Sequence, residues 1–126
     1  MKIAVIVARV LMGLIFVVFG LNGFLQFLKA PLPTGLAGEF LTVLFQSHWV
    51  LFISAVQLAG GILLLVNRYV PLALALLGPV IMNIILYHLL LNPAMAQPAM
   101  LVTVLWFFLF YVYRKNFAGL FVAKAP

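Results

Sequence analysis

Charged residues are scarce in this chain. Only eight of the 126 residues carry a formal charge, and Glu39 is the only one of them that is acidic. Because the apolar stretches hold no carboxylate or thiol, a self-contained hydrolase is disfavoured. Cysteine is absent, which excludes disulfides, thiolate metal ligands and dithiol redox chemistry within the chain.

The sequence is correspondingly rich in apolar residues. They make up 68% of the sequence, and the mean hydropathy is +1.35. A soluble domain of this length needs far more polar surface to cover its core. The composition therefore indicates a single-domain integral membrane protein over residues 1–126, with lipid tails as the solvent for most side chains.

Four windows are long and apolar enough to cross a bilayer, which takes roughly 20 residues in a helix. They are residues 3–27, 49–66, 70–91 and 98–113. The first is longer than the apolar region of a signal peptide, and no small-residue cleavage site follows it, so we expect it to be retained.

A fifth apolar segment lies between the first two windows. In residues 35–47, Leu36, Phe40, Val43 and Leu44 recur at helical spacing. We expect a short helix on the outer interface. The predicted fold class is an all-α membrane protein, a four-transmembrane-helix bundle with this short interfacial helix between helices 1 and 2.

Basic residues predict the orientation. If the N-terminus is cytoplasmic, that side holds six of the seven basic residues, and the other side holds Lys29 alone. The excess of Lys and Arg on cytoplasmic loops then places both termini in the cytoplasm. We expect a multi-pass protein of the bacterial cytoplasmic (inner) membrane. The basic pI of about 10.2 does not indicate nucleic acid, because no basic patch lies on a soluble face.

Polar residues inside the third window are the first candidates for function. Asn83 and Tyr87 share a face, and His88 lies about 100° further round the helix. Carboxamide, phenol and imidazole suit the carbonyl of a quinone, and His can also carry a proton. The alternative is a polar network that sets helix packing.

Two further polar residues have a structural and a functional interpretation. Gln57 shares a stripe with Ser54, Gly60 and Gly61, which favours a helix–helix contact, with a ligand contact as the alternative. Arg9 is expensive to place in hydrocarbon. We expect it to snorkel and bind a lipid phosphate, with a bound ligand or a partner subunit as the alternative.

A metal site and a catalytic site find little support in the sequence. His48, His88 and Glu39 lack the spacing of a metal motif, so no metal site is predicted. The sequence likewise gives no catalytic residue. Quinone is the one candidate cofactor.

The sequence resembles the DoxX family of small bacterial membrane proteins. The resemblance rests on ARVLMGLIFVVFGLNGF (8–24), VQLAGGILLLVNRYVPLALALLGPVIMNIILYH (56–88) and the closing Tyr-Arg-Lys. It implies a four-helix membrane bundle, and some relatives are subunits of a thiosulfate:quinone oxidoreductase or partners in oxidative-stress complexes. This chain has Gln57 where such proteins often have Glu, which weakens a proton-transfer role there.

Three functions follow as hypotheses. The first is an accessory subunit of a bacterial redox or respiratory membrane complex, which contacts membrane lipids and other integral-membrane subunits and binds quinone or lipid. The second is a quinone-linked oxidoreductase with its site in the outer half of the bundle. The third is a small transporter, disfavoured because four spans offer few polar residues for a pore.

Overall fold

The computed structural model describes residues 2–25, 33–93 and 97–123. These residues are almost entirely helical. The α-helices are α1 (Lys2–Leu25), α2 (Leu36–Gln46), α3 (Trp49–Val66), α4 (Val70–Leu90) and α5 (Gln97–Val112), and a 3₁₀ helix, η2 (Arg114–Phe121), follows. The all-α prediction and the helix within 35–47 are confirmed. The window 49–66 matches α3 at both ends, and residues 26–27 of the first window lie outside the described residues.

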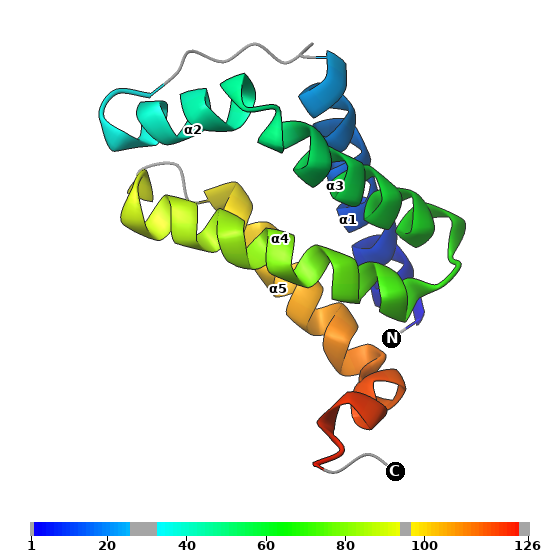
Figure 1. The fold of residues 1–126 in the computed structure, drawn as a ribbon. Coiled ribbons are helices and arrows are strands. Elements are labelled where there is room, and N and C mark those ends of the chain that lie inside the picture. Colours follow the sequence, from blue (N-terminus) through cyan, green and yellow to red (C-terminus); the bar gives the residue numbers. More distant parts are fainter. Residues whose placement is uncertain (1, 26–32, 94–96, 124–126) are drawn as a thin grey trace.

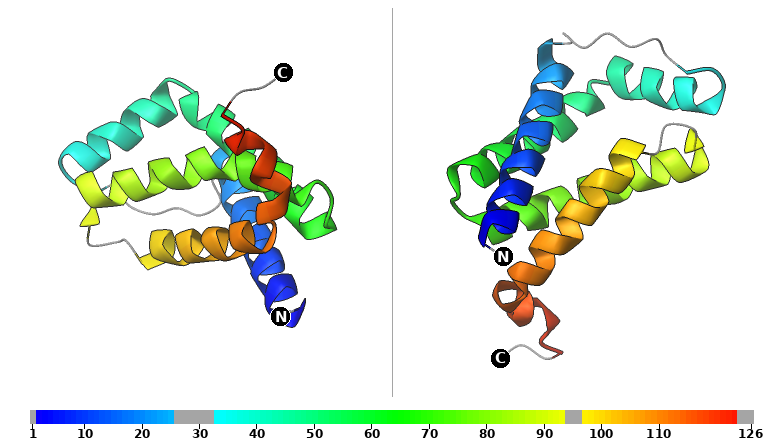
Figure 2. Two further views of the ribbon diagram at one scale, coloured as in Figure 1. Left: turned by 90° about the horizontal axis from the view of Figure 1, so that it is seen from below. Right: turned by 180° about the vertical axis from the view of Figure 1, so that it is seen from behind.

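The long helices close into a cycle of contacts. Helix α1 packs along α3, α3 on α4, α4 on α5, and α5 returns to α1, while α2 contacts α3. Figures 1 and 2 show the start of α1 and helix η2 on the same side of the molecule as the turn between α3 and α4, with α2 at the opposite end. The segments that carry Lys2, Arg68, Arg114 and Lys115 therefore lie at one end of the bundle.

The contact between α1 and α3 is close enough for backbone to touch backbone. A methyl group on Gly61 would lie 2.8 Å from the Val17 nitrogen and 2.9 Å from the Gly13 oxygen. A methyl group on Gly20 would lie 2.9 Å from the Leu58 nitrogen. Small residues at such positions let membrane helices approach each other, because no side chain holds them apart.

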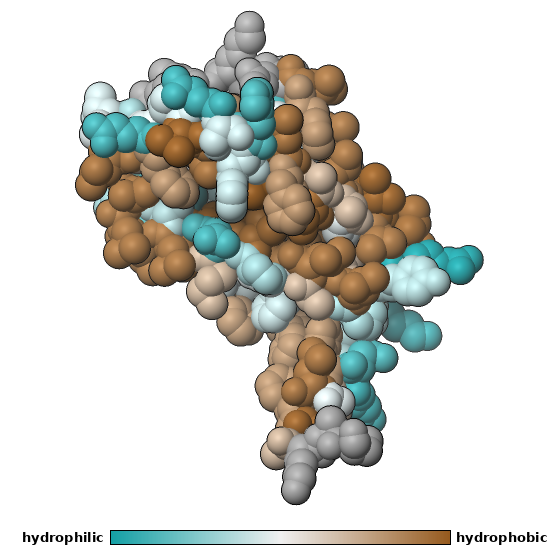
Figure 3. All heavy atoms as spheres, viewed as in Figure 1, coloured by the Kyte–Doolittle hydropathy of each residue, from teal (hydrophilic) through white to brown (hydrophobic). Residues whose placement is uncertain are grey.

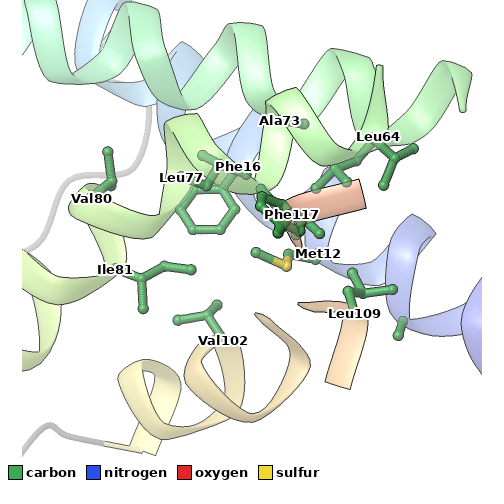
Figure 4. Packing of buried hydrophobic residues seen from close by; sticks show 13 residues of the cluster. Met12, Phe16, Leu64, Ala73, Leu77, Val80, Ile81, Val102, Leu109 and Phe117 are labelled. Atoms are coloured by element: carbon green, nitrogen blue, oxygen red, sulfur yellow. The ribbon is translucent and has the colours of Figure 1, made fainter. Parts of the chain in front are cut away.

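The buried core lies where the helices meet. Met12 and Phe16 of α1, Leu64 of α3, Leu77 of α4 and Leu109 of α5 are almost completely buried. Figure 4 shows these side chains converging, with Phe117 of η2 and several smaller residues around them. The core therefore ties all four long helices and the 3₁₀ helix into one unit.

An indole joins α4 to α5. The Nε1–H of Trp106 donates to the carbonyl of Leu74 at 2.9 Å. Gly78 leaves room for the ring, since a methyl group there would lie 3.4 Å from it. Trp106 stacks on Phe110 with centroids 5.1 Å apart. An indole N–H that is withdrawn from water is stabilised by such an acceptor, and this half-buried one thereby fixes the register between the two helices.

Three of the described helices are by themselves long and apolar enough to cross a membrane: α1, α3 and α4. Helix α5 has 16 residues, and it meets this description only together with η2, to which it is bent by 82°. Hydrophobic residues cover most of the face shown in Figure 3, and hydrophilic residues gather toward its two ends. The helices thus have the length and surface of a multi-pass membrane protein.

The α1–α3 contact gives a first prediction. Gly20→Leu should lower the free energy of unfolding by about 1–3 kcal/mol, because the added side chain meets the backbone of α3. The gain in helix propensity, about 1 kcal/mol, offsets only part of this. Unfolding in detergent, followed by circular dichroism, measures the change.

Gly119→Leu is the matched control, because nothing lies within 4 Å of a methyl group at that position. Its effect should stay within about 0.5 kcal/mol. Equal effects of the two substitutions would show that the close approach of α1 and α3 does not support the fold.

Candidate functional site

The polar side chains of α4 bond to their own helix. The Nδ2 of Asn83 donates to the carbonyl of Pro79 at 2.9 Å, and Nδ1 of His88 lies 2.9 Å from the carbonyl of Ile84. A carbonyl oxygen only accepts, so the second bond requires the proton on Nδ1 of His88. In the neutral ring, Nε2 is then left as an acceptor.

The ring of Tyr87 lies between those of His88 and Phe40 at the α2 end of the bundle. The ring of Tyr87 meets that of His88 edge-on, with centroids 5.0 Å apart. The ring of Tyr87 also lies near that of Phe40 of α2, with centroids 5.8 Å apart. Tyr87 and His88 are both half-buried, while Asn83 is exposed one turn away. The short helix α2 therefore contacts the predicted site residue Tyr87 through Phe40.

Gln57 makes no described contact with the other predicted site residues. It is half-buried in α3, and within the described residues no hydrogen bond or ring contact links it to Asn83, Tyr87 or His88. Its neighbours on the stripe behave as the helix–helix interpretation predicts. Ser54, Gly60 and Gly61 are all buried, and Ser54 lies directly against Gly23 of α1.

A shallow apolar hollow lies beside His88, between α4 and α5. Its volume is about 210 Å³. The residues that line it are Ile85, His88, Leu89, Ala99, Met100, Thr103 and Val104. The hydroxyl of Thr103 donates to the carbonyl of Ala99 at 2.6 Å, so it too bonds to its own helix. Sequence reasoning missed the α5 side of this hollow, because Ala99, Thr103 and Val104 resemble any lipid-facing residues until α5 is placed on α4.

A second hollow, of about 450 Å³, lies at the start of α2. Pro33, Gly35, Glu39 and Thr42 are among the residues that line it. Glu39 is exposed, and His48 is exposed beyond the other end of α2. Within residues 2–25, 33–93 and 97–123, no group of three or more His, Cys, Asp or Glu side chains comes together.

Arg9 lies at the opposite end of the bundle from His88. Its Nη1 donates to the carbonyl of Leu64 and, at 3.3 Å, to that of Leu65. These carbonyls belong to the last turn of α3, where helix oxygens lack intrahelical partners and carry partial negative charge. The half-buried guanidinium therefore caps α3 from α1. A lipid phosphate as a further ligand of Arg9 stays a prediction.

Comparisons of the chain with protein-family models, with curated proteins and with solved structures found no match. The resemblance to the DoxX family therefore stays a prediction, and the site has to be interpreted from its own geometry.

The position of Arg9 gives a second prediction. Arg9→Gln should lower the free energy of unfolding by about 1–3 kcal/mol, because it removes charge-assisted bonds to the end of α3. Arg68→Gln is the control, since it removes the same charge from an exposed side chain in the adjacent turn. Unfolding in detergent compares the two, and equal losses would show that only the charge of Arg9 counts.

Proposed function

We propose that this protein is an accessory integral-membrane subunit of a bacterial redox or respiratory complex, with both termini cytoplasmic. We further propose that it holds a quinone-type or lipid ligand against His88. The observation that carries the ligand proposal is the apolar hollow of about 210 Å³ between α4 and α5, which has His88 at its edge. Ligand sites are lined predominantly by apolar side chains.

The proton on Nδ1 of His88 selects the form of the ligand. With Nδ1–H bonded to the Ile84 carbonyl, Nε2 of the neutral ring accepts a hydrogen bond. A ligand that reaches Nε2 from the hollow would therefore bind better through the hydroxyl of a reduced quinol than through the carbonyl of a quinone. A quinol would supply two-electron redox chemistry to a partner subunit, while this chain would orient its ring.

The size of the hollow supports a holding role. Pockets that enclose a small molecule usually measure about 300–1,000 Å³, and this one is smaller and partly open. It suits one ring or a short length of a lipid chain, with the rest of the ligand in the bilayer or against another subunit.

The bonding of the polar side chains supports an accessory role. Asn83, His88 and Thr103 bond to carbonyls of their own helices, and Arg9 caps a neighbouring helix. These bonds stabilise the bundle and leave little hydrogen-bonding capacity for moving protons.

A second candidate function is a quinone-linked oxidoreductase with its site in the outer half of the bundle. The observation that favours it is the contact between the rings of Tyr87 and His88.

One face of α5 is suited to other membrane helices. Met100, Val104, Phe107 and Tyr111 follow one another at helical spacing, and all four are exposed. Trp106 and Phe110 of the same helix are instead packed against the core. The exposed face can contact lipid or the helices of a larger subunit.

Purification from native membranes in mild detergent tests the accessory role. We expect the chain to migrate with larger integral-membrane subunits, which mass spectrometry of the isolated complex would identify. A single monodisperse species of this chain alone would contradict the proposal.

Lipid extraction from the same sample tests the ligand. His88→Ala should lower the amount of bound quinone or quinol by about tenfold, since a lost hydrogen bond of about 1.4 kcal/mol corresponds to that factor. The control is His48→Asn, because His48 is exposed and has a left-handed backbone that Asn tolerates. Unchanged occupancy in His88→Ala would remove His88 from the site.

A further inference from the structure

The chain turns sharply where α5 ends. Helix η2 follows directly after Tyr113 and is inclined at 82° to α5. Figure 1 shows this segment in red, turned away from the line of α5. A continuous straight span through residues 97–121 is thereby excluded.

The length of α5 places this bend near the membrane surface. Its 16 residues rise about 24 Å at 1.5 Å each, which is less than the hydrocarbon thickness of about 30 Å. For an α5 that starts at the opposite surface of the bilayer, the residues after Val112 then begin at the edge of the hydrocarbon and not out in water.

Two side chains at the bend have the character of an interface. Tyr111 is exposed, and the guanidinium carbon of Arg114 lies 4.2 Å from the centre of its ring. Nη1 of Arg114 also donates to the Tyr111 carbonyl at 2.7 Å. Tyrosine is enriched at headgroup level, and arginine near a helix end directs its charge there.

A buried ring attaches η2 to the bundle. Phe117 is 5% exposed, and its ring centroid lies 4.9 Å from that of Phe110 in α5. The same segment then exposes three consecutive apolar side chains, with Leu120 at 74%, Phe121 at 75% and Val122 at 58%. Phe117 therefore holds η2 near the end of α5 while these three point away from the core.

We propose that residues 114–122 are an anchor in the membrane interface that recognises anionic lipid. Leu120, Phe121 and Val122 insert at the boundary of headgroups and acyl chains, and Arg114 and Lys115 bind the anionic headgroups. Apolar side chains beside basic ones are typical of segments that lie on a membrane surface. The anchor is independent of any ligand at His88.

The charge of this end matches an anionic surface. Arg114 and Lys115 are exposed, as are Lys2 and Arg68 at the same end of the bundle. The single carboxylate side chain of the protein, Glu39, lies at the other end, in α2. A basic surface attracts anionic headgroups with about 1 kcal/mol for each Lys or Arg close to them.

The absence of cysteine makes the proposal directly testable. Each single-cysteine variant of this chain has one thiol for a nitroxide spin label. Phe121→Cys reports on the anchor, Phe107→Cys on the exposed face of α5 away from the hollow, and Arg68→Cys on the exposed turn after α3. The labelled proteins are placed in vesicles of phosphatidylcholine and phosphatidylglycerol.

Collision with oxygen, which concentrates in lipid, is then compared with collision with a water-soluble nickel chelate. The label at Phe121 should favour oxygen, as at Phe107, whereas the label at Arg68 should favour the nickel chelate. A label at Phe121 that is as accessible to nickel as that at Arg68 would overturn the proposal. Protection from both reagents would also overturn it, because another protein chain would then cover the segment.

A second substitution tests the preference for anionic lipid. Lys115→Gln, in the Phe121→Cys background, should lower the ratio of inserted to detached segment about fivefold, the loss expected for one basic residue. Lys115→Arg keeps the charge and should restore the ratio, and vesicles of phosphatidylcholine alone should remove the difference. An equal ratio for Gln and Lys in anionic vesicles would show that the headgroups are not recognised.

Discussion

The close approach of α1 and α3 is the constraint on which the rest of the bundle depends. Gly13 and Gly61 bring the two backbones within van der Waals contact. In a bilayer the hydrophobic effect does not drive helices together, so packing of this kind has to do so. The same approach allows Arg9 of α1 to reach the last carbonyls of α3. The α1–α3 contact thus packs the two helices together and also gives the Arg9 guanidinium hydrogen-bond acceptors within the bundle.

Helices α4 and α5 complete the bundle by different means. The Trp106 bond to Leu74 and the space above Gly78 set their register at the middle of the pair. Toward the α2 end the two helices leave the apolar hollow beside His88. Toward the other end, Phe110 and Phe117 hold η2 at the close of α5. The hollow and the proposed anchor therefore lie at opposite ends of one helix pair, and each can be changed without the other.

The polar residues show how limited a sequence prediction of the site is. The sequence predicts that Tyr87 and His88 lie together, and their rings are in contact because they are adjacent on one helix. It groups Gln57 with them only by polarity, and no described contact supports that grouping. It also leaves Arg9 without a protein partner, because backbone carbonyls have no signature in the sequence. The bond between Nδ1 of His88 and the Ile84 carbonyl likewise involves a backbone oxygen that the sequence pattern does not reveal.

Composition and the spacing of apolar windows determined the helices, their approximate ends and their lipid-compatible surface, because each of these follows from local hydrophobicity and helix geometry. Scarcity of charge was enough for that conclusion. Only the tertiary structure decided that Arg9 caps α3, that Ala99 and Thr103 share a hollow with His88, and that the chain bends by 82° after α5. These features depend on which helix faces meet and where a backbone oxygen is left open, and neither is encoded in any one segment.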